Sequence, residues 1–293
     1  MMHGGMVLLK RGSETVIGQE SAMRYQIASV SKQFTATAVL LLAQDGLLHL
    51  DDPLERWIPG WPGVTLHHLL AHTSGIGHWH DYPMIDLAVR VEPADLVETF
   101  RSVPPLFPPG ARWAYSSPGY VLAAQVVERV AGTPYREFLD RRIFVPAGLA
   151  GTFAGSPGDR CHIAPGHDTR GEPVPSWELD VVGMGAGDVW STTADMITWM
   201  DVLGAGGVLR EPWRTLMLTE HAVTGKDTDS HGYGYGWFLG DYNGERWFQH
   251  SGDNAGYKAF VACLPESDRR LAVLVNTDAM DASSLRALYR KLL

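Results

Sequence analysis

Strand-like segments at both ends of the chain, separated by a long helical stretch, restrict its fold more than any other feature. Segments 6–10 and 14–18 are short, rich in apolar and β-branched residues, and joined by a turn around Gly12. Four more strands are predicted near the C-terminus, at 235–239, 246–250, 258–264 and 271–276. One sheet assembled from both ends of the chain accommodates all these segments most simply. We therefore predict an α+β fold with an inserted helical region.

Helical periodicity fills the middle of the chain and returns at its end. Residues 29–44 are apolar almost all round after the first turn, which is typical of a buried helix, and Gly46 follows as a C-terminal cap. Other helices are predicted at 118–131, after Thr192, and at 282–293. We expect one structural unit with two parts. These are a discontinuous sheet domain, 1–28 plus 185–293, and a mainly helical region, 29–184.

The charge balance and the cysteine content exclude several classes of protein. The chain has 293 residues, with 24 Lys and Arg against 33 Asp and Glu, so nucleic acid is not an expected partner. Its two cysteines are too few for a disulfide framework or a four-cysteine zinc site. No apolar run reaches the roughly 18 residues of a membrane span, and the N-terminus lacks the pattern of a secretion signal. We expect no membrane association and a cytoplasmic location, whereas the oligomeric state is unknown.

A serine and a lysine stand three residues apart at the start of the predicted buried helix. At this spacing Ser29 and Lys32 share one helix face, so the amine lies beside the hydroxyl. A serine needs a neighbouring base to be nucleophilic at neutral pH, and a dehydrated lysine with a lowered pKa can serve as that base. The same four residues also fit a plain N-cap followed by a solvated lysine, so the pattern does not determine the chemistry alone.

Four other motifs follow in order along the chain. They are His68-Leu-Leu-Ala-His-Thr-Ser-Gly-Ile76, Tyr115-Ser116-Ser117, Tyr233-Gly-Tyr-Gly-Trp237, and His250-Ser251-Gly252. With Ser29 and Lys32, this series resembles the penicillin-recognising serine hydrolases, and within them the group of class C β-lactamases, D-aminopeptidases and family VIII esterases. The resemblance extends over nearly the whole chain. It implies a β-lactamase/transpeptidase-like fold, with an antiparallel sheet flanked by helices, and no cofactor.

The resemblance also implies roles for individual residues. Ser29 matches the acylated nucleophile, Lys32 the lysine that shares its proton, and Tyr115 a general base whose phenol neighbouring cations partly ionise. His250 begins the element that matches K-T-G on the strand lining the cleft and is included among the catalytic residues. The oxyanion hole would consist of the backbone N–H groups of Ser29 and Asp253. The residues expected to bind substrate are Ser117, Ser251, Gly252, Trp79 and Trp113.

Two positions depart from the pattern of the resembled family. Ser117 stands where Asn is usual, so one short hydroxyl replaces an amide donor and acceptor. His250 replaces a lysine whose fixed charge suits a substrate carboxylate, whereas histidine is mostly neutral near pH 7. The serine puts polarisation of a substrate amide in doubt more than acylation itself. The histidine favours an esterase or aminopeptidase over an efficient β-lactamase or carboxypeptidase.

Three further patterns allow more than one interpretation. Five histidines fall within residues 67–80, but this stretch already matches a structural motif of the resembled family, so no metal site is expected. The glycine-rich segment 183–187 lacks the surroundings of a nucleotide-binding motif and is interpreted as a turn. Trp79, Trp113 and Trp177 lie in loop-like stretches near the motifs, and we expect some of them to line an apolar acyl pocket.

The predicted function is that of a serine hydrolase acting through an acyl-enzyme on an ester or amide of a small molecule or short peptide. Three alternatives stay open: acyl transfer to an amine or alcohol in a biosynthetic pathway, β-lactamase or D-Ala peptidase action, and a non-catalytic penicillin-binding-like acyl sensor. Diversion of the acyl group by added amines would identify the transferase, and a stable adduct without turnover would identify the sensor. A purely structural module would form no adduct.

Overall fold

A computed structural model describes the chain except residues 1–4, 19–20, 87–88, 90, 175–182 and 226–227. Within the described residues, the largest element is an antiparallel sheet of eight strands in the order β2-β1-β11-β10-β9-β8-β7-β6. Its strands are β1 (Gly5–Arg11), β2 (Glu14–Gly18), β6 (Ala222–Val223), β7 (Gly232–Tyr233), β8 (Phe238–Tyr242), β9 (Glu245–Asn254), β10 (Tyr257–Leu264) and β11 (Arg269–Val275).

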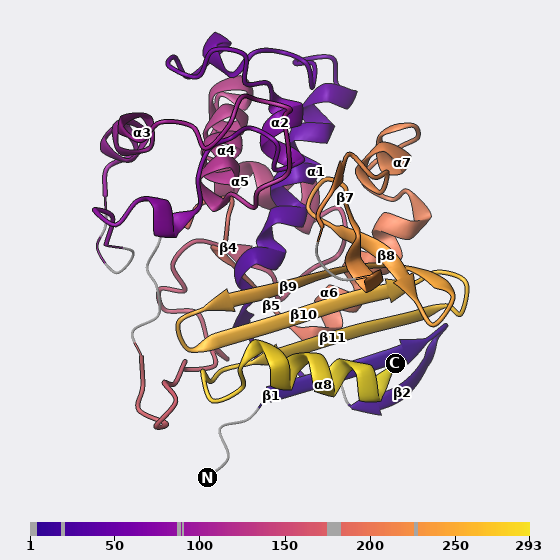
Figure 1. The fold of residues 1–293 in the computed structure, drawn as a ribbon. Coiled ribbons are helices and arrows are strands. Elements are labelled where there is room, and N and C mark those ends of the chain that lie inside the picture. Colours follow the sequence, from indigo (N-terminus) through magenta and orange to yellow (C-terminus); the bar gives the residue numbers. More distant parts are fainter. Residues whose placement is uncertain (1–4, 19–20, 87–88, 90, 175–182, 226–227) are drawn as a thin grey trace.

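The two ends of the chain meet inside this sheet. Strand β1 pairs with β11 from Gly5 opposite Val275 to Arg11 opposite Arg269. The N-terminal hairpin of β1 and β2 is thereby added to the C-terminal meander of β8 to β11. Figure 1 shows the indigo strand β1 beside the yellow strand β11. The predicted α+β class, with one sheet built from both ends and flanked by helices, is confirmed.

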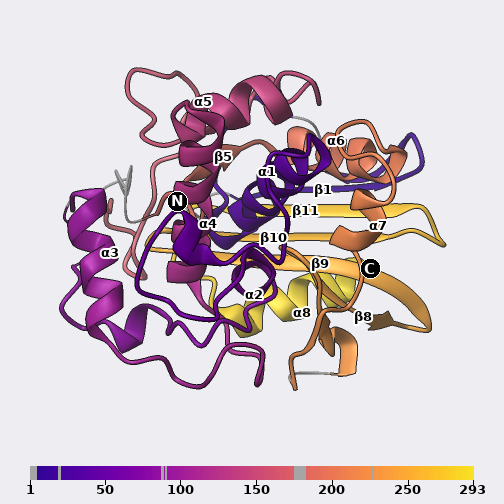
Figure 2. The same ribbon diagram turned by 90° about the horizontal axis from the view of Figure 1, so that it is seen from above.

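Helices cover both faces of the sheet. Figure 1 shows α8 packed on one face, whereas α1 and α6 lie on the other, and Figure 2 shows α1 between α4 and α5 on one side and α6 and α7 on the other. The helices are α1 (Lys32–Gln44), α2 (Leu66–Leu70), α3 (Pro93–Ser102), α4 (Ser117–Ala131), α5 (Tyr135–Leu139), α6 (Thr193–Ala205), α7 (Trp213–Met217) and α8 (Ala282–Leu292). The short helical turns are η1 (Ala28–Ser31), η2 (Leu54–Arg56), η3 (Trp79–Asp81), η4 (Asp140–Phe144) and η5 (Thr228–Ser230).

Two apolar cores hold the helices to the sheet. The larger core surrounds α1, where every residue from Lys32 to Ala43 is buried, as its nearly uniform apolar sequence predicts. In this core the ring of Phe34 lies 4.8 Å from that of Trp199. The smaller core lies under α8, where Phe260 stacks on Tyr289 with ring centroids 4.0 Å apart. Apolar burial on both faces of the sheet therefore stabilises the fold.

A small second sheet carries the chain into α1. It has the order β3-β5-β4, formed by Tyr25–Gln26, Val189–Ser191 and Phe153–Ala154. The chain passes from β3 through η1 into α1, so the helix predicted at 29–44 begins as a 3₁₀ turn and becomes α-helical at Lys32. This connection places the first turn of the buried helix against the main sheet.

One predicted strand is wrong, and the reason is local. Residues 235–239 were expected to form a single strand, but β7 ends at Tyr233 and β8 begins at Phe238. Gly236 between them has φ +78°, a backbone conformation that L side chains rarely adopt. A Cβ atom at this position would lie 2.9 Å from the Lys32 carbonyl oxygen, so the turn packs tightly against the start of α1.

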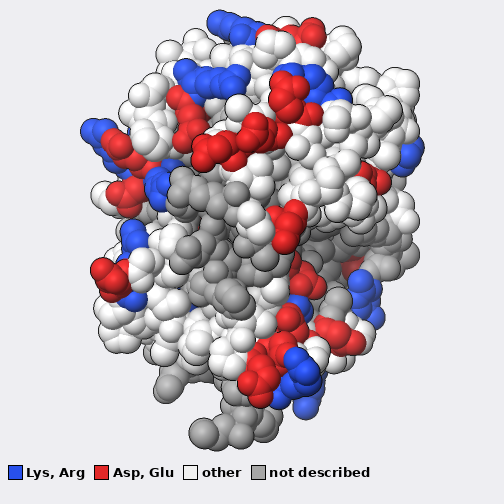
Figure 3. All heavy atoms as spheres, turned by 90° about the vertical axis from the view of Figure 1, so that its left-hand side faces the viewer, with Lys and Arg blue, Asp and Glu red and all other residues white. Residues whose placement is uncertain are grey.

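The helices predicted to begin after Thr192 and at residue 282 begin there in the structure. Thr192 caps α6 by accepting a hydrogen bond from the Asp195 N–H at 3.0 Å, and Asp281 caps α8 in the same way. Within the described residues, no helix combines the length and the apolar character needed to cross a bilayer. On the face drawn in Figure 3, acidic side chains are interspersed with basic ones over the described surface.

Candidate active site

Ser29 lies on the strained turn η1 where β3 passes into α1. The preceding Ala28 has φ +48°, which is unusual for a residue with a side chain. Two hydrogen bonds to β5 hold this turn: Ile27 N–H donates to the Val189 carbonyl at 2.9 Å, and Val189 N–H donates to Ser31 Oγ at 3.1 Å. Ser31 is fully buried in this contact, whereas Ser29 stays partly exposed. The turn therefore presents one of its two serines to the solvent side.

The amine of Lys32 lies at the centre of the polar contacts around Ser29. Its Nζ is 3.1 Å from Ser29 Oγ, 3.1 Å from Ser117 Oγ and 2.8 Å from the Ala186 carbonyl oxygen. The 3₁₀ geometry of η1 aligns residues three apart, which brings the serine and lysine side chains together. Lys32 is fully buried, and this burial holds its pKa well below the usual value, although Asp188 opposes part of the shift.

Tyr115 packs beside this lysine, at the end of the loop before α4. Its ring centroid lies 4.9 Å from Lys32 Nζ. Burial raises the pKa of the Tyr115 phenol far above its usual value, and the nearby Ser29 hydroxyl lowers it only in part. The expectation of a partly ionised phenol is therefore wrong, because loss of solvent around the ring outweighs the attraction of a lysine that is itself difficult to charge.

Two histidines of the predicted cluster orient the loop that carries Tyr115. His72 Nδ1 accepts a hydrogen bond from the Ser116 N–H at 3.1 Å, and His78 Nδ1 accepts one from the Ser117 N–H at 3.2 Å. The His72 ring also packs 4.3 Å from the ring of Tyr115. These histidines thus position the tyrosine and Ser117, a role that their spacing in the sequence did not reveal.

His250 lies on β9 with both ring nitrogens close to polar atoms. Its Nδ1 is 2.7 Å from the Ser251 carbonyl oxygen, and its Nε2 is 3.2 Å from the Tyr233 hydroxyl. A carbonyl oxygen only accepts, so Nδ1 carries a proton, and Nε2 is then free to accept from the tyrosine. These two contacts fit a neutral imidazole with its proton on Nδ1. The ring is almost completely buried, 6.2 Å from that of Tyr115.

Gly252 allows β9 to approach the turn that carries Ser29. A Cβ atom on Gly252 would lie 2.2 Å from the Ile27 carbonyl oxygen. The absence of a side chain at Gly252 thus lets β9 pack against the backbone of Ile27, in addition to any room that it leaves for substrate. Strand β8 pairs with β9 only as far as Gln249, so the segment after His250 has β10 on one side and the turn that carries Ser29 close by.

Ser251 and Asp253 occupy the other face of β9, because side chains alternate along a strand. Ser251 lies opposite Phe260, a member of the core under α8, and both Ser251 and Asp253 are exposed. Their side chains therefore lie on the sheet face away from Ser29. The backbone of Asp253, rather than its carboxylate, remains the group predicted for the oxyanion hole.

The predicted tryptophans separate into different environments. Trp113 belongs to an aromatic group around Tyr115, with ring centroids 6.3 Å from Tyr115 and 6.2 Å from Phe238. Trp79 instead packs on α3, where its ring lies 5.9 Å from that of Phe100. Trp177 falls outside the described residues. Of the two described tryptophans, Trp79 and Trp113, only Trp113 thus belongs to the aromatic group around Tyr115.

Comparison with known proteins assigns the chain to a family. The family model described as Beta-lactamase matches residues 3–293, almost the complete chain. The chain belongs to the beta-lactamase family.

Two curated relatives of this beta-lactamase family chain are named as a penicillin-binding protein and as an esterase. Penicillin-binding protein 4* of Bacillus subtilis is 30% identical over 280 residues, which cover 87% of this chain and 61% of that protein. Esterase EstB of Burkholderia gladioli is 30% identical over 257 residues, which cover 73% of this chain and 65% of that protein. The chain thus spans less than two thirds of the length of either relative.

Solved structures show the same fold. A penicillin-binding protein from Bacillus halodurans superposes with a TM-score of 0.86 at 28% identity, covering 98% of this chain and 95% of that one. The D-amino acid amidase from Ochrobactrum anthropi SV3, complexed with L-phenylalanine, superposes with a TM-score of 0.84 at 26% identity, covering 98% and 92%. Hydrolases with esterase and amidase names are therefore among the relatives of this beta-lactamase family chain.

Two contributors to this beta-lactamase family site were not predicted from the sequence. The glycine-rich segment 183–187 is a turn, as interpreted, but it also brings the Ala186 carbonyl to Lys32 Nζ. Asp188, which follows the turn, is buried and raises the pKa of Lys32 against the effect of burial. The cluster of glycines was the available signal, since such a turn lets backbone groups approach closely.

Proposed function

We propose that this chain is a serine hydrolase that forms an acyl-enzyme on Ser29 with a neutral ester or amide of a small molecule or short peptide. The observation that carries the proposal is the contact of 3.1 Å between Ser29 Oγ and the Nζ of fully buried Lys32. An amine whose pKa burial lowers can be neutral near pH 7 and accept a proton, which a solvated lysine cannot do.

The three contacts of Lys32 match the donor and acceptor capacity of a neutral amine. The Ala186 carbonyl can only accept, so it takes one N–H of the amine. Ser117 Oγ can accept the second N–H. The nitrogen lone pair is then directed to the Ser29 hydroxyl, which donates its proton to Nζ as Oγ attacks the substrate carbonyl carbon. Ser117 in this scheme orients the base and does not polarise a substrate amide.

Tyr115 would act as a neutral proton relay. After Oγ bonds to the carbonyl carbon, the backbone N–H groups of Ser29 and Asp253 would stabilise the negative oxygen. The tetrahedral intermediate then expels the alcohol or amine, which takes a proton from the Tyr115 phenol, and the Lys32 ammonium returns a proton to the phenol. Water repeats the sequence to release the acid and restore both groups. A phenol with a raised pKa stays protonated, as this role requires.

The state of His250 supports a neutral acyl donor. Its contacts with the Ser251 carbonyl and the Tyr233 hydroxyl fit an uncharged ring. The position therefore offers no fixed positive charge to a substrate carboxylate. The names of two relatives, an esterase and a D-amino acid amidase, agree with an ester or amide substrate of this kind.

Intact-protein mass spectrometry after incubation with a fluorophosphonate tests the nucleophile. The matched control is Ser31→Ala, because Ser31 belongs to the same turn but is buried against Val189. We expect one phosphonate adduct on the wild type and on Ser31→Ala, and none on Ser29→Ala. An adduct that persists in Ser29→Ala, or no adduct on the wild type, would contradict the proposal.

A second arm tests the fate of the acyl group. The wild type is given p-nitrophenyl acetate with and without an added primary amine, and the acetate and acetamide products are measured. Hydrolysis is expected to dominate. If the amine captures most of the acetyl group at millimolar concentration, the protein is an acyltransferase. That result would contradict the proposed hydrolysis but not the proposed acyl-enzyme.

A further inference from the structure

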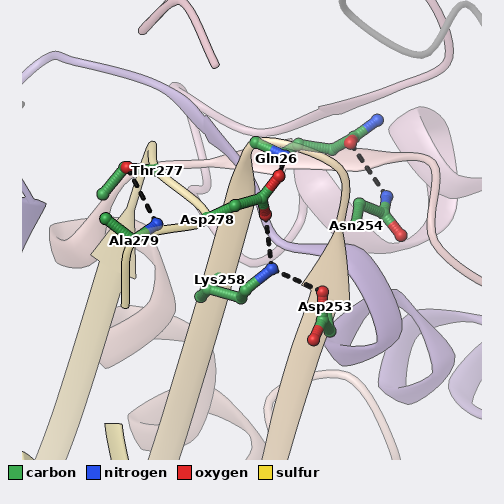
Figure 4. Close-up of polar contacts among 8 residues, drawn as sticks. Gln26, Asp253, Asn254, Lys258, Thr277, Asp278 and Ala279 are labelled. Carbon is green, nitrogen blue, oxygen red and sulfur yellow. Dashed lines mark hydrogen bonds and ion pairs between the residues drawn. The ribbon is translucent and has the colours of Figure 1, made fainter. Parts of the chain in front are cut away.

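A buried lysine and two carboxylates form an ion cluster behind the strand end that carries the proposed oxyanion amide. Lys258 on β10 stands directly opposite Asp253 on β9 in the sheet register. Its Nζ lies 2.6 Å from Asp253 Oδ1 and 2.6 Å from Asp278 Oδ1. Figure 4 shows the lysine between the two carboxylates. The side chain of Lys258 is only 9% exposed, whereas that of Asp253 is 68% exposed. One buried cation therefore serves two carboxylates at this place.

The same cluster fixes the turn between β9 and β10. Asp278, in the segment after β11, accepts a hydrogen bond from the Gly256 N–H at 2.9 Å through its second oxygen. The Asp278 N–H in turn donates to the His167 carbonyl at 2.9 Å. Lys258 thus joins β9, β10 and the segment after β11 at one point.

The opposite face of the strand end is tied to the nucleophile. Asn254 Nδ2 donates to Gln26 Oε1 at 2.8 Å and to the Gly187 carbonyl at 3.1 Å. Gln26 lies three residues before Ser29, and Gly187 follows the residue whose carbonyl contacts Lys32. A shift of Asp253 would therefore be transmitted to the turn that positions the nucleophile and its base.

We infer that Lys258 is a positioning residue for the reaction, which holds the backbone N–H of Asp253 in place and neutralises the carboxylate of the same residue on the opposite face of the sheet. This inference rests on the proposed function. An unpaired carboxylate on the residue that donates to the oxyanion would oppose the charge that the amide stabilises. Burial by itself would lower the pKa of Lys258, but the hydrogen bonds to Asp253 and Asp278 raise it, so the cation persists at neutral and alkaline pH.

The test compares kcat and KM for p-nitrophenyl acetate in a set of variants. Lys258→Met removes the charge and keeps the length of the side chain, and we expect kcat to fall about tenfold or more with KM changed less than about twofold. Lys258→Arg restores a cation and should keep most of the activity. Adding Asp253→Asn to Lys258→Met should recover at least half of the lost kcat on a logarithmic scale, because the unpaired carboxylate is gone.

The control is Arg246→Met, which breaks an exposed ion pair with Glu266 at the far end of β9 and should leave kcat unchanged. A wild-type kcat in Lys258→Met would overturn the inference. A double variant as slow as the single one would also overturn it, since a merely structural role gives no recovery when the carboxylate is removed. Lys258→Gln, which keeps a donor but no charge, provides the same comparison if the methionine variant does not fold.

The fluorophosphonate experiment separates the two proposals. A wild type that forms the Ser29 adduct, together with a Lys258→Met variant of normal kcat, contradicts the positioning role only. A wild type without any adduct contradicts the proposed function itself.

Discussion

Gly252 packs its backbone directly against the carbonyl group of Ile27, two residues before Ser29. The contact joins the end of β9 to the turn η1, and Ala28 in that turn has a positive φ. Two chain segments more than 200 residues apart are thus in contact beside Ser29. Contacts from two strands hold this turn in its strained conformation: β9 packs against it at Gly252, and β5 forms hydrogen bonds with it through Val189.

Gly252→Ala is expected to impair both stability and activity. The new methyl group would lie 2.2 Å from the Ile27 carbonyl oxygen, so the strand and the turn must move apart. We expect the free energy of unfolding to fall by about 1–3 kcal/mol and hydrolysis to slow by roughly tenfold or more. Urea denaturation and ester hydrolysis measure the two effects.

Gly204→Ala is the matched control for that substitution. Gly204 lies in α6, and a Cβ atom there meets no other group within 4 Å. Alanine should leave hydrolysis unchanged and raise the free energy of unfolding by up to about 1 kcal/mol, because it favours the helix. Equal losses in the Gly204 and Gly252 variants would show that the contact with Ile27 is not the cause.

The reaction rate should rise with pH as Lys32 loses its proton. Because burial holds the folded-state pKa of Lys32 well below the ordinary 10.5, the neutral amine forms at a lower pH than in solution. The value of kcat/KM should therefore increase with pH and level off well below pH 10.5. A rate that increases only as an ordinary lysine titrates would contradict the role of Lys32.

The same shift makes stability depend on pH. Between the lowered pKa of folded Lys32 and 10.5, the unfolded chain holds a proton that the folded chain does not, so the contribution of Lys32 to the free energy of unfolding rises with pH in this window. Lys32→Met removes this contribution and should lower hydrolysis on the order of 10³-fold. Urea denaturation of both proteins at several pH values measures the difference in slope.

Tyr115→Phe should slow hydrolysis in proportion to the need of the leaving group for a proton. An alkyl ester or an amide must gain a proton to leave, so we expect a loss on the order of 10²-fold. A p-nitrophenolate leaves without help, and its loss should be below roughly tenfold. Rates with an ethyl and a p-nitrophenyl ester of the same acid test this. Equal losses with both esters would assign Tyr115 another role.

His250→Lys should improve reaction with an acyl donor that carries a carboxylate. A lysine supplies the fixed charge that the neutral imidazole lacks, so acylation by benzylpenicillin should become about tenfold faster relative to phosphonylation by a fluorophosphonate. Time-resolved mass spectrometry of the adducts measures both rates in the same preparation. An unchanged ratio would show that His250 does not control the charge preference of the site.

The local structure follows from patterns that lie within a few residues. The hairpin of β1 and β2, the cap at Thr192 and the spacing of Ser29 and Lys32 each depend on neighbours along the chain. The segment around Gly236 was misjudged as a strand for a physical reason. Its aromatic and apolar residues fit a strand, but its glycine adopts a positive φ and packs against α1, a contact that no local pattern encodes.

The sequence alone determined three things: the order of its motifs indicated the family, its strand and helix patterns the α+β class, and a spacing of three residues the pairing of a serine with a lysine. The protonation states needed for chemistry depend instead on the folded chain. Lys32 has a lowered pKa because distant segments exclude water from it, and it contacts a carbonyl 154 residues away. Tyr115 stays neutral for the same reason. Tertiary packing removes solvent from these groups and pairs residues that are far apart in the sequence. A motif therefore identifies the candidate reacting groups, but their protonation states depend on the folded structure.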